Sequence, residues 1–103
     1  MKKEDLKGVV TPEQITLWKN LHGEIFSVQV DGSICYLKKP DRSTFKAIAS
    51  IGQSDPVRAN EVLLNDCWLG GDETIKTDDE KFFGVSSQIA GLIEIKQAEL
   101  KKL

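Results

Sequence analysis

The clearest pattern in the chain is an alternation of apolar and polar positions over residues 25–38, which predicts paired β-strands. Asp31-Gly32 interrupts this pattern and is a favoured pair for a two-residue type I′ turn, so the segment predicts a β-hairpin. With that turn, one face is almost entirely apolar, and its cross-strand pairs are Val30 with Ser33, Val28 with Cys35, and Phe26 with Leu37. The other face pairs Gln29 with Ile34, Ser27 with Tyr36, and Ile25 with Lys38. Because an isolated two-stranded ribbon is marginal in water, helices or a partner's strand must cover the apolar face.

The segment before the hairpin carries the markers of a short helix over residues 12–21. Thr11 can cap it, Pro12 suits the first helical position, Gln14 completes a capping box with Thr11, and Gly23 can end the helix. Its apolar residues recur at a spacing of three: Ile15, Trp18 and Leu21. Residues 1–10 are charged and without periodicity, so we expect a mobile N-terminal arm.

The segment after the hairpin is predicted to be helical in three stretches. The first is capped by Asp41 or Ser43, and the second by Asp55, with Gly70-Gly71 at its end. A capping box of Thr77 and Glu80 then opens a long helix over about residues 78–102. Its predicted buried stripe consists of Phe82, Val85, Ile89, Leu92 and Ile93. The predicted fold class is therefore α+β, with one hairpin at about residues 24–38 packed against three to four helices in a single domain over residues 11–103.

The stretch "DCWLGGDETIKTDDE", residues 66–80, holds five acidic residues between positions 72 and 80. One interpretation is a Ca²⁺ or Mg²⁺ site, but an EF-hand loop needs oxygen ligands at alternating positions, where Ile75 and Lys76 stand. The other interpretation is a joint between two helices. In that interpretation the glycines end one helix, the acidic residues lie in the first turn of the next, and Trp68 and Leu69 pack beneath the loop. We expect the joint, and no metal.

Composition and charge narrow the possible functions. The chain has 103 residues, a formal net charge of −2 and a pI of about 5.4, which argues against nucleic-acid binding through bulk charge. No apolar run approaches the roughly 20 residues of a membrane span, and no apolar segment follows the basic start as in a signal peptide. We therefore expect a cytoplasmic protein that makes no membrane contact. Cys35 and Cys67 are then expected to be reduced, buried thiols, although their spacing leaves a disulfide open.

No catalytic motif is present, so we expect no enzymatic activity and no cofactor. A nucleophilic set would need Cys35 or Cys67 to meet His22, the single histidine, or Asp66, yet both cysteines fall on predicted apolar faces. A zinc site would need three or four Cys and His ligands, more than the chain supplies in one cluster. Glycine-rich phosphate loops, G-x-S-x-G and H-E-x-x-H are all missing from the sequence.

A basic run next to Tyr36 gives an alternative function, a small regulatory domain that binds nucleic acid or an acidic partner. Its members are Lys38, Lys39, Arg42 and Lys46. A solvated helix and strand surface also explains these residues, and it is the interpretation that we expect.

Two short motifs suggest a family. Tyr36, Pro40, Asp41 and Arg42 fit an aromatic-x-x-x-P-(S/D)-R pattern at the end of the hairpin, and Leu63, Leu64 and Cys67 fit an LL-x-x-C segment. Together with the order of hairpin, helix, helix, acidic loop and closing helix, they make residues 24–103 resemble the tail assembly chaperones of long-tailed bacteriophages and prophages. The chain also resembles uncharacterised small proteins of intestinal bacteria, which agrees with a prophage origin. The helix predicted at residues 12–21 has no counterpart in that family.

The resemblance implies a non-enzymatic, protein-binding role in the bacterial cytoplasm. Such chaperones coat the long, aggregation-prone tape-measure protein, self-associate along it, and leave as tail-tube subunits polymerise. For this chain we expect strand addition at the hairpin edge and packing of helices into grooves. The expected contact residues are apolar or aromatic positions off the main stripes: Ile34, Tyr36, Leu64, Trp68, Ile95 and Leu100. The alternative left open is that the core extends further around the helices and includes them.

Overall fold

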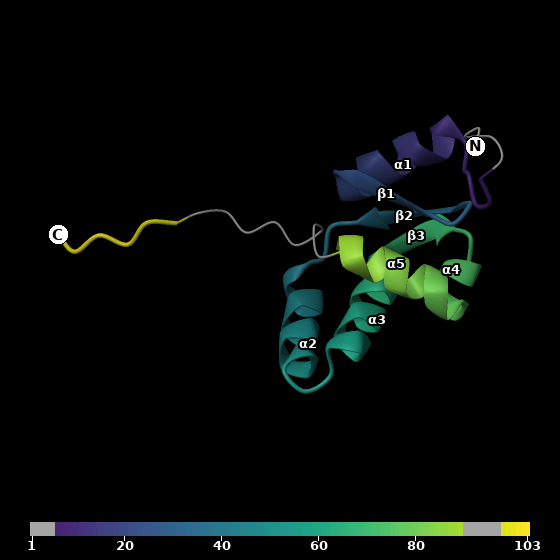
Figure 1. Ribbon diagram of the computed structural model, residues 1–103. Coiled ribbons are helices and arrows are strands. Elements are labelled where there is room, and N and C mark those ends of the chain that lie inside the picture. The colour runs from purple at the N-terminus through teal and green to yellow at the C-terminus, as the bar shows by residue number, and fades with distance from the viewer. Residues whose placement is uncertain (1–5, 90–97) are drawn as a thin grey trace.

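The computed structural model describes residues 6–89 and 98–103 and has an α+β fold, as predicted (Figure 1). A three-stranded antiparallel sheet has the order β1-β2-β3, so β2 is the central strand. The strands are β1 (Ile25–Val30), β2 (Ser33–Lys38) and β3 (Trp68–Gly71). The helices are α1 (Pro12–His22), α2 (Arg42–Gly52), α3 (Pro56–Cys67), α4 (Thr74–Thr77) and α5 (Asp79–Ile89).

The hairpin forms with the predicted register. Val30 lies opposite Ser33, Val28 opposite Cys35, and every further pair follows the same count. Asp31 and Gly32 have φ angles of 46° and 76°, the positive values that a type I′ turn requires at both central positions. The turn chemistry and the apolar pattern therefore specify the same pairing.

The helices cover both faces of the sheet (Figure 1). The main core lies between the predicted apolar face of the hairpin and the helices α3, α4 and α5. Its buried members are Cys35, Leu37, Leu63, Leu64, Cys67, Ile75, Phe82, Val85 and Ile89, with Phe26, Val28 and Val30 packed against them. On the opposite face, α1 places Trp18 against Tyr36, with 5.7 Å between the ring centroids. The predicted buried residues Phe82, Val85 and Ile89 are confirmed, whereas Leu92 and Ile93 lie outside the described residues.

Four helix starts use side-chain caps. Thr11, Asp41 and Asp55 accept hydrogen bonds from the backbone N–H groups of Gln14, Thr44 and Arg58, as the sequence predicted. The predicted capping box of Thr77 and Glu80 is wrong, because Thr77 ends the short helix α4. Instead the Asp78 carboxylate accepts from the N–H groups of Glu80 and Lys81 and begins α5.

Three further predictions about segments need correction. The helix expected to run up to Gly70-Gly71 stops at Cys67, because Trp68–Gly71 pairs with β2 as a third strand. Residues 98–102, expected at the end of a long helix, are not helical. Part of the expected mobile arm is bonded to the sheet: the Lys7 N–H donates to the Gly32 carbonyl and the Ile34 N–H donates to the Lys7 carbonyl, both at 2.9 Å.

Candidate functional site

The outer edge of β1 is the longest uncovered strand edge in the described part of the chain, since β3 and Lys7 occupy the other side of β2. In a hairpin closed by a two-residue turn, the residues flanking the turn form a hydrogen-bonded pair, and such pairs then alternate along the strands. Val30, Val28 and Phe26 therefore direct their backbone groups toward β2. Ser27 and Gln29, between them, direct their N–H and C=O groups outward, where they can pair with another strand.

Within the described residues, the sequence of this edge carries none of the features that usually protect an edge strand against pairing. Natural edge strands are commonly protected by lysine, proline, a bulge or an inward-pointing charge. β1 has the sequence IFSVQV, without a charged residue, a proline or a glycine, and it pairs with β2 without a bulge. An unprotected edge rich in β-branched and aromatic residues is a template for strand addition.

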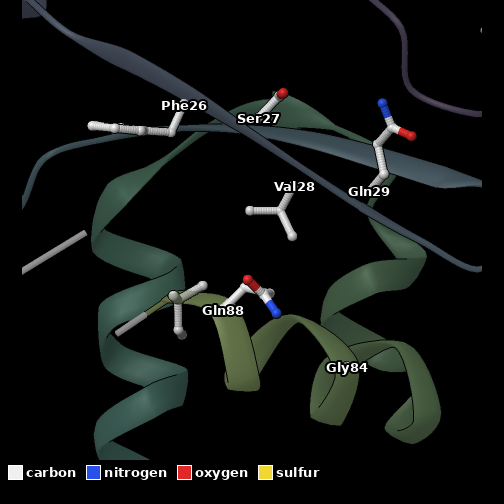
Figure 2. A pocket seen from close by; sticks show the side chains of 7 residues that line it. Phe26, Ser27, Val28, Gln29, Gly84 and Gln88 are labelled. Atoms are coloured by element: carbon white, nitrogen blue, oxygen red, sulfur yellow. The ribbon is translucent and has the colours of Figure 1, made fainter. Parts of the chain in front are cut away.

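A first cavity, of about 470 Å³, lies beside this edge on the α5 side of the sheet. Figure 2 shows Val28 directed from β1 toward Gln88 of α5, whereas Ser27 is directed away from that helix. Gly84 lets α5 approach the strand here, because a Cβ atom at this position would lie 2.7 Å from Cγ2 of Val30. The lining residues are Phe26, Ser27, Val28, Gln29, Gly84, Gln88 and Ile89.

A second cavity, also of about 470 Å³, lies beside the same edge on the α1 side. Ser27 and Gln29 line both cavities, so the edge runs between them. The other lining residues of the second cavity are Leu6, Val9, Ile15, Ile34 and Tyr36. Successive side chains of a strand point to opposite faces of a sheet, so a strand added to β1 would direct its side chains alternately into the two cavities.

The described lining of the two cavities is uncharged. Among the residues that the structure describes, no charged side chain lines either cavity, although 29% of the chain's residues are charged. An ionised group entering the site would lose hydration without gaining a partner there, which is unfavourable. The site therefore fits an extended, uncharged segment with apolar side chains.

Three of the six predicted partner-contacting residues are buried in the structure. Ile34 and Tyr36 are each 6% exposed and Leu64 is 2% exposed, so the expectation that they lie on the surface is wrong. The physical reason is that α1 covers the second face of the hairpin and the core extends around α3, the alternative that the sequence left open. Ile34 and Tyr36 still form the floor of the second cavity.

The other three predicted contact residues are dispersed. Trp68 is half-buried beneath the Lys76 ammonium, which lies 4.3 Å from the ring centroid. Leu100 is fully exposed in a segment without regular structure, and Ile95 lies outside the described residues. The structure therefore does not assemble the predicted set into one surface.

The predicted basic patch is interleaved with acidic residues. Lys39 forms a 3.4 Å ion pair with Glu24, while Arg42 and Lys46 are exposed one turn apart on α2. Asp41 lies directly before Arg42 and places a negative charge beside it, and hydrogen bonds from Thr44 lower the pKa of its carboxyl group. The patch is thus a mixed surface, not a uniform cationic one.

The acidic joint forms a polar network that the sequence did not predict. The Ser33 hydroxyl donates to the Asp72 carboxylate at 2.5 Å, and the Lys81 ammonium donates to Ser33 Oγ and to Thr74 Oγ1, each at 3.0 Å. The hydrogen bonds from Ser33 and Thr74 lower the pKa of Asp72 to about 2. Ser33 is fully buried and its hydroxyl hydrogen is already bonded to Asp72, so this Ser-Lys pair has no access to a substrate. The network joins β2, the loop and α5.

The residues considered for a nucleophilic site, Cys35, Cys67 and Asp66, have structural roles instead. Burial raises the pKa of both Cys35 and Cys67 to about 11, so each thiol is protonated near neutral pH and is a poor nucleophile. The Asp66 carboxylate accepts a 3.3 Å hydrogen bond from the Thr44 hydroxyl and thereby links α2 to α3. Within residues 6–89 and 98–103, no three His, Cys, Asp or Glu side chains are grouped to hold a metal ion.

Comparison with family models, curated proteins and solved structures gives no significant match for the chain. None of the helices in the described segments is both long and apolar enough to span a lipid bilayer. The candidate site therefore rests on the geometry of the β1 edge and its two cavities.

Proposed function

We propose that the chain is a non-enzymatic protein-binding module that takes an extended segment of a client protein as an additional strand on β1. The observation that carries this proposal is the unprotected, uncharged edge of β1 between two cavities. In this mode of recognition, main-chain hydrogen bonds supply affinity, and pockets for alternate side chains supply specificity.

The geometry also defines the chemistry of the client. Its backbone bonds to the outward N–H and C=O groups of Ser27 and Gln29. One set of its side chains packs against Val28 and Ile89 in the first cavity, and the alternate set packs against Ile15 and Tyr36 in the second. The client segment is therefore uncharged and free of proline over its paired residues, and it is apolar on at least one side.

We further propose that this binding serves assembly, as in the phage tail assembly chaperones that the chain resembles. A structural protein awaiting assembly exposes apolar segments whose final partners are missing, and such segments aggregate. A small protein that covers them reversibly, in the bacterial cytoplasm, would keep the client available. The tape-measure protein is the client that the resemblance implies.

The proposal is tested by replacing Ser27 with proline. Proline removes the outward N–H of an edge strand without removing a hydrogen bond to β2, so the hairpin is retained. The probe is a labelled peptide of about eight alternating valine and threonine residues with terminal lysines, whose binding is measured by fluorescence anisotropy. We expect Ser27→Pro to weaken binding by about tenfold or more, the loss of about 1.4 kcal/mol.

The matched control is Ser27→Ala, which keeps the N–H group and removes only the hydroxyl. We expect it to bind the peptide within about twofold of the unmodified chain. Equal binding by the proline and alanine variants, with the circular dichroism spectrum unchanged, would contradict strand addition at this edge.

A further inference from the structure

The β1 edges of two copies are complementary to each other, which indicates what pairs with this edge when no client is bound. We propose that a second copy of the chain pairs with β1 antiparallel through the same edge, forming a two-fold symmetric dimer with a continuous six-stranded sheet. This inference rests on the proposed function, because it assigns a partner to the same site. The partner has the required chemistry, since its β1 is uncharged, free of proline and rich in residues with high β propensity.

The side-chain pattern of β1 selects one register. If Val28 lies opposite Val28 of the second copy, Ser27 lies opposite Gln29, and Phe26 lies opposite Val30. All three apolar residues then pair with apolar residues on one face, and the polar residues pair on the other. A register shifted by two residues in either direction is less favourable. One shift places Val30 opposite Glu24, and the other places Phe26 opposite Gly32 in the turn.

The same register satisfies the backbone. Ser27 and Gln29 of each copy carry the outward N–H and C=O groups, and this register makes them the hydrogen-bonded pairs across the new junction. The two-fold axis runs perpendicular to the sheet between the two Val28 residues, because paired residues of antiparallel strands point to the same face. The apolar side chains of one copy therefore lie on the same face as the first cavity of the other, between β1 and α5.

The dimer and the client compete for one edge, so pairing between copies protects the site until a client displaces it. A junction of one six-residue strand from each copy is small compared with an obligate dimer interface, which makes this exchange reversible. The expected behaviour is a dimer that dissociates on dilution or on addition of the alternating peptide.

Single-cysteine variants test the register directly. The chain contains only two cysteines, so Cys35→Ala and Cys67→Ala together give a background in which any added thiol can form only intermolecular disulfides. In the proposed register the two Val28 residues form a non-hydrogen-bonded pair, whose Cα separation of about 4.5 Å allows a disulfide. The two Ser27 residues are displaced diagonally by about 7 to 8 Å or more, beyond disulfide range.

We expect Val28→Cys in this background to yield at least about fivefold more disulfide-linked dimer than Ser27→Cys under mild oxidation, on a non-reducing gel. Circular dichroism and thermal unfolding establish that both variants fold. A yield from Ser27→Cys that equals or exceeds that from Val28→Cys overturns the register, and no linked dimer from either variant overturns the pairing.

Light scattering behind size-exclusion chromatography tests the same claim with both native cysteines retained. We expect the unmodified chain to shift from monomer to dimer with rising concentration, and Ser27→Pro to remain monomeric. An unmodified chain that stays monomeric throughout overturns the dimer, whereas its peptide binding, if still abolished by Ser27→Pro, leaves the proposed function standing. Dimerisation without peptide binding would instead support the dimer and contradict the proposed function.

Discussion

At the scale of single residues, the polar network around Ser33 shows how buried polar groups are satisfied without forming a reactive site. Asp72 accepts from Ser33 and Thr74, and Lys81 donates to the same serine, so each of these groups has a partner. The sequence placed Asp72 in an acidic cluster but could not show that Ser33, 39 positions earlier, would face it. That contact depends on the pairing of β2 with β3, a long-range feature that local patterns do not encode.

The lowered pKa of Asp72 makes a prediction about acid stability. Hydrogen bonding lowers this pKa from 3.8 to about 2 on folding, so the ionised carboxylate stabilises the folded state above the unfolded-state pKa. This contribution is lost as the pH falls from 3.8 to about 2. We expect Asp72→Asn to be less stable than the unmodified chain at neutral pH, and the difference in unfolding free energy to shrink across that window. Urea denaturation at a series of pH values measures it.

Asp79→Asn is the matched control for this titration, because Asp79 lies exposed in the first turn of α5 and outside the network. We expect it to retain the acid-dependent loss of the unmodified chain between pH 3.8 and about 2. A difference between Asp72→Asn and the unmodified chain that stays constant through this window would show that the carboxylate charge has no part in stability.

At the scale of elements, the short strand β3 depends on a glycine that no other residue can replace without strain. Gly71 has a φ angle of +135°, and a Cβ atom there would lie 2.5 Å from the Ile34 carbonyl oxygen and 2.5 Å from Cys35 Cα. We expect Gly71→Ala to lower the free energy of unfolding by about 3 kcal/mol or more, because backbone strain and overlap with β2 act together. Thermal or chemical denaturation measures this loss.

Gly23→Ala provides the comparison for Gly71→Ala. Gly23 also has a positive φ angle, +83°, but a Cβ atom there would meet open space. We expect this substitution to cost only about 1 kcal/mol, the conformational contribution alone. If the two alanine variants were equally stable, close packing of β3 against β2 would not explain the requirement for glycine at position 71.

The elements that the sequence predicted correctly are those determined by local chemistry. The Asp31-Gly32 turn set the hairpin register, and Thr11, Asp41 and Asp55 marked three helix starts, because caps and turns involve neighbours a few residues apart. The third strand was missed because "WLGG" lacks an alternating pattern and forms only by pairing with β2. The last helix begins within one residue of its predicted start, but Asp78 caps it in place of Thr77.

At the scale of the whole molecule, the order of strands determines which edge is available. β3 and Lys7 occupy one side of β2, which leaves β1 at the other edge of the sheet. The sequence predicted strand addition at the hairpin but assigned the contacts to β2, at Ile34 and Tyr36, which α1 and the sheet enclose. The lack of charged residues in β1 could have indicated from the sequence that this strand is the edge open to pairing. The two cavities were not predictable, because α5, α1 and the N-terminal residues reach the edge only in the folded chain.

Hydrogen exchange at individual β1 amide groups, followed by NMR with and without the alternating peptide, tests the strand-addition account most directly. The protein is kept at a concentration at which light scattering shows the monomer. We expect the peptide to slow exchange at the outward N–H groups of Ser27 and Gln29 by about tenfold or more, while Val28, already bonded to β2, changes little. Protection that is absent from β1, or that appears instead around Arg42 and Lys46, would contradict the account.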